Sequence, residues 1–291
     1  MRFEDLGRRA LDTATARGAQ YADVRFESVD TERIEVRNAV VASLADSRSV
    51  GYGIRALVDG AWGFAASGDL THEGIDATAA RAVTIARASA SIARRPFGEA
   101  PKTAHTDRFT TPLVRDPRTV PLGDRVALLL AAEKALHSTK SIGVGRAWLD
   151  LWNTEKFFFS SIGSAIEQRI VQTGSGVQAL AVGDGDVQAR SFPGDNGLYK
   201  SGGWEIVEEA RLIENAARIG EEATALLTAP QCPSGTFDII LGGSQMSLQI
   251  HESCGHPAEL DRHHRSEERE EQHCQLVRCQ KQHTTHREWN D

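Results

Sequence analysis

A two-residue turn constrains the fold of this 291-residue chain more than any other single feature. Asp59-Gly60 separates two strand-like stretches, residues 50–58 and residues 61–64. Glycine tolerates the positive φ that such a short turn requires, so the two stretches are predicted to form an antiparallel β-hairpin. Residues 21–28 show the alternation of a further strand. We therefore expect an antiparallel sheet in this part of the chain.

Helices are expected before and after these strands. Apolar residues recur at helical spacing from Phe3 to Ala14. Thr71 is a favourable N-cap for a long alanine-rich helix that extends to about Ile92. Residues 1–93 are therefore predicted to form an N-terminal α+β domain with antiparallel strands and long helices.

The middle of the chain divides into a proline-rich segment and a second domain. Residues 94–121 hold five prolines and few apolar runs, which indicates a linker or an irregular crossing. Residues 122–228 are predicted to form a central domain with antiparallel strands between two helices. Its expected elements are a helix at residues 123–137, strand-like segments through Arg190 with a turn at Asp184-Gly185, and an amphipathic helix at residues 204–227, with Ile206, Ala210, Ile213 and Ala217 on one face.

A short strand–turn–helix unit follows within residues 229–262. Residues 236–241 read TFDIIL, which is typical of a strand, and Gly242-Gly243 then turns the chain. Ser244 is predicted to be the N-cap of a helix that continues to Ile250. This unit carries the strongest chemical signal of the sequence.

That signal is the sequence HESCGH at residues 251–256. Two imidazoles on one short segment suit Zn²⁺, and Glu252 is placed to act as a base. Histidines five residues apart point about 140° away from each other on a regular α-helix. They can converge if Gly255 and Pro257 break the helix, or if the helix widens into a π-type turn. The alternative is a helix end with two solvated histidines.

Other residues near the motif carry weaker signals. Cys254 is expected to be a buried free thiol and not a ligand, and Cys232 is expected to be structural. Glu259 and Asp261 could orient an imidazole, but surface acids in ion pairs are the favoured interpretation.

The composition changes abruptly at residue 263. Residues 263–291 contain half of the ten histidines, two of the four cysteines, and no Gly, Ala, Pro, Ile or Phe. Disorder is therefore expected. The favoured hypothesis is an aberrant tail from a reading-frame change or truncation. A charged, solvated tail is one alternative. A metal-binding tail with Cys274, Cys279, His283 and His286 is the other, although these residues lack the spacing of a zinc finger.

Composition also excludes some classes of function. The net charge of −7 disfavours a nucleic-acid partner, which would call for a basic surface. The sequence has no apolar run of 18 residues and no signal-peptide pattern, so we expect a cytoplasmic protein without a membrane partner. Four unevenly spaced cysteines do not make a disulfide framework.

Residues 1–262 resemble the TldD/PmbA family of zinc metallopeptidases, specifically its TldD-like branch. The resemblance is carried by residues 37–64, by residues 238–241, and most specifically by residues 249–262. It implies that His251 and His256 are zinc ligands and that Glu252 is the catalytic base or acid. The implied activity is hydrolysis of peptide bonds in extended or unfolded peptides.

The resemblance also implies a partner and a missing part. The family pairs a TldD-like subunit with a PmbA/TldE-like one, so a heterodimer with such a subunit, or a homodimer, is expected. The family's third zinc ligand is a cysteine in a β-rich C-terminal domain, and the resemblance stops after Arg262. Residues 229–262 are therefore expected to be the beginning of an incomplete metallopeptidase domain. Impaired activity is expected, and the alternative is a non-catalytic subunit that acts as an assembly module.

Overall fold

The computed structural model describes residues 2–93, 100–183, 185–194 and 196–258, and it divides the chain into two units. The first unit comprises residues 1–230 and the second residues 231–291. The first unit combines helices with a mainly antiparallel sheet, which confirms the predicted α+β class. The finer domain boundaries given above stay a prediction.

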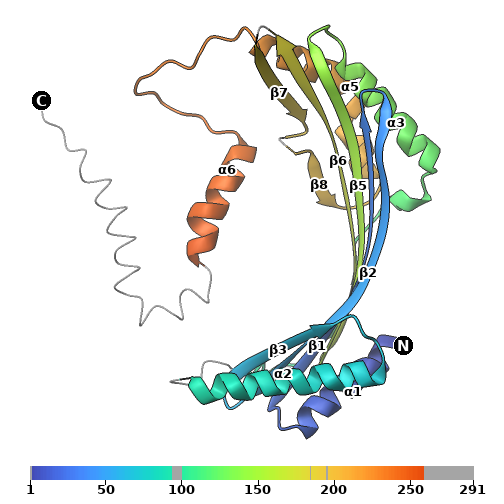
Figure 1. Ribbon diagram of the computed structural model, residues 1–291, viewed down its shortest axis with the longest axis vertical. Helices are drawn as coiled ribbons and strands as arrows, with labels where there is room; N and C mark the ends of the chain where they lie inside the picture. The colour runs from blue at the N-terminus through green and yellow to red at the C-terminus, as the bar shows by residue number, and fades with distance from the viewer. Residues whose placement is uncertain (1, 94–99, 184, 195, 259–291) are drawn as a thin grey trace, which may run out of the picture. The chain divides into compact units, whose positions relative to one another are not determined.

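One sheet of eight strands organises the first unit (Figure 1). Its order is β3-β2-β1-β5-β6-β4, and β7 and β8 also pair with β6. Neighbouring strands are antiparallel except β4 and β6, which are parallel. The strands are β1 (Tyr21–Arg37), β2 (Val40–Val58), β3 (Ala61–Ser67), β4 (Thr106–Thr110), β5 (Ile142–Ser160), β6 (Ala165–Gly183), β7 (Asp186–Phe192) and β8 (Leu198–Ser201).

Two tight turns set the register of the first three strands. Asp59 and Gly60 have φ values of 48° and 74° and connect β2 to β3, so the predicted hairpin is confirmed. Asn38 and Ala39 connect β1 to β2 with φ values of 47° and 63°. This second turn lacks glycine, and the pattern of the sequence did not reveal it.

A first hydrophobic core lies under two helices at one end of the sheet. Helices α1 (Arg2–Ala16) and α2 (His72–Ile92) pack on the N-terminal half of β1 and on β2 and β3. The Oγ1 atom of Thr71 accepts a hydrogen bond from the Gly74 N–H at 3.1 Å, so the predicted cap of α2 is confirmed. Val24 and Phe26 of β1 are fully buried in this core.

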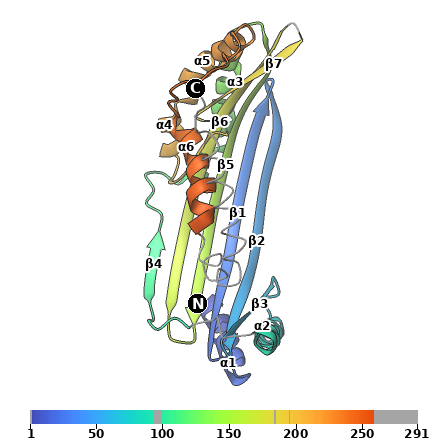
Figure 2. The same cartoon turned by 90° about the vertical axis from the view of Figure 1, so that its left-hand side faces the viewer.

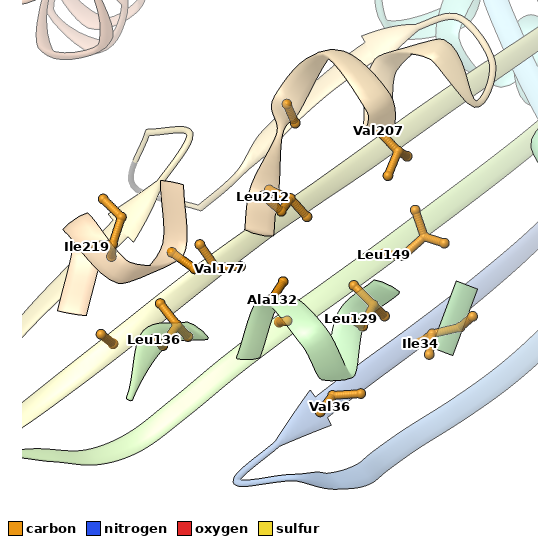
Figure 3. Packing of buried hydrophobic residues seen from close by; sticks show 14 of the residues in the cluster. Ile34, Val36, Leu129, Ala132, Leu136, Leu149, Val177, Val207, Leu212 and Ile219 are labelled. Carbon is orange, nitrogen blue, oxygen red and sulfur yellow. The ribbon is translucent and has the colours of Figure 1, made fainter. Parts of the chain in front are cut away.

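A second hydrophobic core lies at the other end of the same strands (Figure 3). Helices α3 (Leu122–Leu136), α4 (Glu205–Ala210) and α5 (Leu212–Leu226) supply Leu129, Val207 and Ile219, among others. Ile34 and Val36 of β1 and Leu149 of β5 face these helices. The strand β1 therefore contributes side chains to both cores.

Polar residues occupy the stretch of β1 between the two cores. Ser28, Asp30 and Glu32 lie on the same face of the strand as the buried Phe26 and Ile34, because side chains alternate along a strand. Glu32 accepts a hydrogen bond from Arg125 of α3, and both side chains are at least nine-tenths buried. This ion pair marks the near edge of the second core.

Two predicted elements of the first unit differ from the structure. Residues 106–110 of the proline-rich segment form β4, which pairs with β6, and Pro117–Thr119 forms a short 3₁₀ helix. The predicted helix over residues 204–227 is broken at Arg211, whose φ is +46°. The break changes the buried face, so Leu212 and Ala216 are buried while Ile213 is 42% exposed.

The second unit also corrects two predictions. Residues 236–241 do not form a strand, and no strand in the described part of the chain pairs with them. Ile240 is therefore 99% exposed. Helix α6 (Gly243–Ile250) has Gly242 and not Ser244 at its N-cap. No helix among the described residues has the length and hydropathy that crossing a membrane requires.

We predict that Gly63→Ala destabilises the first unit. A Cβ atom at Gly63 would lie 2.1 Å from the Ala82 oxygen and 2.3 Å from the Ala86 nitrogen, both in the backbone of α2. The added methyl group would force β3 away from α2 and lower the free energy of unfolding by about 1–3 kcal/mol, which urea unfolding measures. Gly123→Ala is the matched control, because nothing lies within 4 Å of its Cβ position and alanine favours a helix. Equal stability of the two variants would contradict the close contact.

We predict an acid-sensitive contact between α1 and α2. Arg9 Nε donates to Asp76 Oδ1 at 3.0 Å and Thr13 Oγ1 donates to the same oxygen at 2.7 Å. The Arg9 hydrogen bond lowers the pKa of Asp76 below its ordinary value. The stabilisation is therefore present above the unfolded pKa of about 4 and is lost as pH falls through the folded pKa. Urea unfolding of wild type and Asp76→Asn should differ at pH 7 and converge toward pH 2.

Candidate metal centre

The end of helix α6 widens at the HESCGH sequence. His251–Gly255 form a π-helical turn, and the His256 N–H donates to the His251 carbonyl, five residues back. A 3₁₀ turn at His256–Ala258 follows. A π-helical turn takes in more residues than an α-helical one, so positions five apart return to nearly the same side of the helix.

The two histidine side chains converge as a result. Their ring centroids lie 4.5 Å apart, with an angle of 77° between the ring planes. One ligand atom from each of His251, Glu252 and His256 lies within 4.8 Å of the others. Of the two backbone routes that the sequence left open, the structure adopts the π-type widening. Gly255 and Pro257 follow the first histidine, but the chain stays helical through them.

The Glu252 carboxylate lies between the imidazoles. Its Oε1 atom is 3.9 Å from His251 Nε2, and its Oε2 atom is 3.8 Å from His256 Nε2. Two imidazole nitrogens and a carboxylate are a ligand set that suits a borderline-soft divalent cation such as Zn²⁺. The same carboxylate can alternatively accept a proton beside a metal held by the two nitrogens.

The cluster is open to solvent in the structure. The side chains of His251, Glu252 and His256 are 63%, 60% and 38% exposed. A hydrogen bond of 2.6 Å from Gln249 Nε2 to Ser253 Oγ links the last turn of α6 to the π-helical turn. The site is therefore shaped by local backbone geometry and side-chain bonding, and not by burial in a core.

The predicted burial of the Cys254 thiol is wrong. Cys254 was expected to be buried, but it is exposed, because no residue of the π-helical turn is buried. Cys232 is exposed as well. Glu259, Asp261 and residues 263–291, including Cys274 and Cys279, lie outside the described residues.

A polar network in the first unit escaped the sequence analysis. Asp150 of β5 is buried and accepts two 3.0 Å hydrogen bonds from Arg33 of β1. The Tyr199 hydroxyl donates to Asp150 at 2.9 Å, and its burial, together with this bond, raises the pKa of Tyr199. Arg33 and Asp150 are directly opposite in the β1–β5 register. That register follows from the whole sheet, so no local pattern could predict the contact.

Comparison with known proteins assigns the family. Residues 22–86 match the family described as PmbA/TldA metallopeptidase domain 1, and residues 115–229 match its central domain. Together the two matches cover more than half of the chain. This chain belongs to the PmbA/TldD family. The family is one of metallopeptidases by name, and both matches lie in the first unit, before the HESCGH sequence.

Individual relatives agree with that assignment. A protein of Methanothermobacter thermautotrophicus named "Metalloprotease" is 28% identical over 242 residues, which is 83% of this chain and 51% of the relative. A crystal structure from Thermotoga maritima, whose name associates it with modulation of a DNA gyrase, matches with a TM-score of 0.60 at 16% identity. That match covers 80% of this chain and 50% of the other.

A third match is a protein named TldE. TldE from Thermococcus kodakarensis matches with a TM-score of 0.50 at 12% identity, over 77% of this chain and 47% of that one. At such identities the two structural matches show a shared fold alone. The chain spans about half the length of these relatives.

The exposure of the two described thiols is testable. In a chain carrying Cys274→Ser and Cys279→Ser, we predict that Ellman's reagent titrates two thiols, Cys232 and Cys254, without denaturant. The same two should react in 8 M urea, which serves as the control. A native count below two would contradict the exposure of Cys232 or of Cys254, and the single variant Cys232→Ser in the same background would show which one.

Proposed function

We propose that this chain is a zinc-dependent metallopeptidase subunit that hydrolyses peptide bonds in extended or unfolded peptides. In this proposal His251 and His256 hold the zinc and Glu252 is the catalytic base. The observation that carries it is the convergence of two imidazoles and one carboxylate on a single widened turn. Membership of a metallopeptidase family supports the same reaction class.

The residues present fit zinc in type and position. Imidazole nitrogens bind zinc at about 2.0–2.1 Å. Ligand atoms around one zinc ion therefore lie closer to one another than the 4.8 Å within which the ligand atoms of this cluster lie. The side chains are exposed, so they can turn through the remaining distance without moving a packed core. Backbone rearrangement is not required, because the π-helical turn already brings the two rings to one side.

The chemistry divides between the metal and the carboxylate. Zinc, when bound, supplies a Lewis acid that lowers the pKa of water and polarises a carbonyl group. Glu252 follows His251 directly in the chain, and its two oxygens face the two imidazoles. From this position Glu252 can take a proton from the attacking water and return it to the leaving amine. His251 and His256 would each hold the zinc through one ring nitrogen.

A third protein ligand and a partner complete the proposal. Catalytic zinc sites usually have three protein ligands, and the described part of the chain supplies two imidazoles at this place. We place the third ligand outside those residues. A PmbA/TldE-like subunit, or a second copy of this chain, would then help to enclose a site that is open to solvent here.

We predict that the histidine variants lose zinc binding and that the Glu252 variant loses only hydrolysis. His251→Ala and His256→Ala should each weaken zinc binding more than about tenfold, measured by elemental analysis after dialysis against buffered zinc. Glu252→Gln should keep the zinc and lower EDTA-sensitive cleavage of fluorescein-labelled casein about 10²-fold or more. His105→Ala and Glu208→Gln are the matched controls, because both residues are exposed and belong to the first unit. Undiminished cleavage by Glu252→Gln would overturn the assigned base.

A second candidate is a non-catalytic assembly module. The open position of the three side chains favours it, because a hydrolytic site normally excludes bulk water. In that case the wild-type chain would bind zinc through His251 and His256 but leave labelled casein intact. The same assay therefore distinguishes the two candidates.

A further inference from the structure

A cavity of about 750 Å³ lies beside helix α1 in the first unit. Its other sides are the first residues of β4, the end of β5 and the start of β6. Strand β4 forms the border of the sheet next to β6 at this place (Figure 2). Ligand-binding sites commonly have volumes of about 300–1,000 Å³, so the cavity is large enough to hold a ligand.

The floor of the cavity is apolar and fixed in place. Phe157 and Phe159 of β5 line it and pack against the first hydrophobic core. The centroid of the Phe157 ring lies 5.1 Å from that of Phe3 in α1. Ala165 lies opposite Phe159 in the β5–β6 register, and its small side chain leaves the floor open there. Such a floor favours an apolar group of the ligand.

The turn between β5 and β6 forms a wall of the cavity. The Ser160 Oγ atom accepts the Ser164 N–H at 3.1 Å, and the Ser160 N–H donates to the Ser164 carbonyl at 3.1 Å. Both serines line the cavity and are buried. The fold itself therefore holds this wall in place, which lowers the entropic cost of binding a ligand.

The cavity continues along α1. A second cavity of about 560 Å³ shares Arg8 and Leu11 with the first and extends to Thr15 and Ala16. From Glu4 to Ala16 the helix rises about 18 Å. An extended chain spans this length with about five or six residues. The elongated shape therefore fits a segment of extended peptide better than a compact small molecule.

The arginine charges at the cavity are already offset. Arg8 lies 3.5 Å from Glu4, and Arg108 lies 2.6 Å from Glu167. All four residues line the first cavity. These pairs add no net charge, so other residues decide the charge of a preferred ligand.

Two aspartates carry the remaining charge. Asp107 lines the first cavity, Asp12 lines the second, and both are exposed. Within the described part of the chain, neither has an ion-pair partner. The Asp107 carboxylate accepts only a neutral N–H, that of Arg108, at 2.7 Å. Two uncompensated carboxylates beside an apolar floor favour a ligand with both cationic and apolar groups.

We propose that this cavity binds an extended peptide segment in which basic and apolar side chains alternate. Successive side chains of an extended chain point to opposite sides. The apolar ones lie on Phe157 and Phe159, and the basic ones reach Asp12 and Asp107 at the rim. Binding does not depend on the proposed zinc chemistry, because all of these residues lie in the first unit.

Peptide composition tests the chemistry of the ligand. Fluorescein-labelled peptides of five residues are titrated with the full-length chain, and binding is measured by fluorescence anisotropy. EDTA is present to prevent metal-dependent cleavage. A peptide of alternating lysine and phenylalanine should bind at least about tenfold more tightly than one with glutamate for lysine or one with serine for phenylalanine. Equal binding of the glutamate peptide, or no binding of the lysine peptide at about 1 mM, would refute the proposal.

Charge reversal tests the location. Asp12→Lys/Asp107→Lys should weaken binding of the lysine–phenylalanine peptide about tenfold or more, because it replaces attraction by repulsion. Glu209→Lys/Glu221→Lys is the matched control, since it changes the net charge equally at exposed positions of α4 and α5. The control should keep the wild-type affinity within about twofold. An equal loss in both double variants would mean that the peptide follows the net charge of the chain, and the proposed site would fail.

Filling the floor tests the cavity itself. Ala165→Trp places an indole beside Phe159 and should weaken binding of the same peptide about tenfold or more. Ala189→Trp, at an exposed position of β7, should bind as the wild type does. Urea unfolding of both variants checks that they are folded. Wild-type affinity in a folded Ala165→Trp chain would place the peptide elsewhere and contradict the proposal.

Discussion

The length of the central strands is the constraint on which the first unit depends. β1 and β5 each serve two hydrophobic cores, one under α1 and α2 and one under α3, α4 and α5. A shift of one residue in the β1 register would turn Val24, Phe26, Ile34 and Val36 to the opposite face together. Both cores therefore fix the same register, and the opposition of Arg33 to Asp150 follows from it.

The metal-centre residues depend on a different kind of order. His251, Glu252 and His256 are neighbours in sequence, and one π-helical turn suffices to gather them. No long-range strand pairing is needed for that convergence. The three side chains are exposed for the same reason. A local turn can orient side chains, but it cannot exclude water from them.

Local signals predicted local structure, and long-range pairing escaped them. The Asp59-Gly60 turn, the Thr71 cap and the π-type route to histidine convergence rest on a few adjacent residues, and the structure bears them out. The alternative route, a helix break at Gly255 and Pro257, is not adopted. Strand β4 was missed because all five of its residues are exposed, so its sequence shows no apolar alternation. Residues 236–241 are the reverse case, a predicted strand that does not form. Their apolar pattern is typical of a strand, but a strand needs a neighbour, and the described residues offer none.

The β6 side of the sheet ends in three short strands and not in one long strand. β4 pairs with residues 165–169 of β6, β8 with residues 172–175 and β7 with residues 177–183. A short edge strand offers few consecutive backbone groups to a passing chain. Division of this border into short pieces is therefore a built-in safeguard against the unwanted strand addition that the nineteen-residue β6 would invite if it stood at the margin itself.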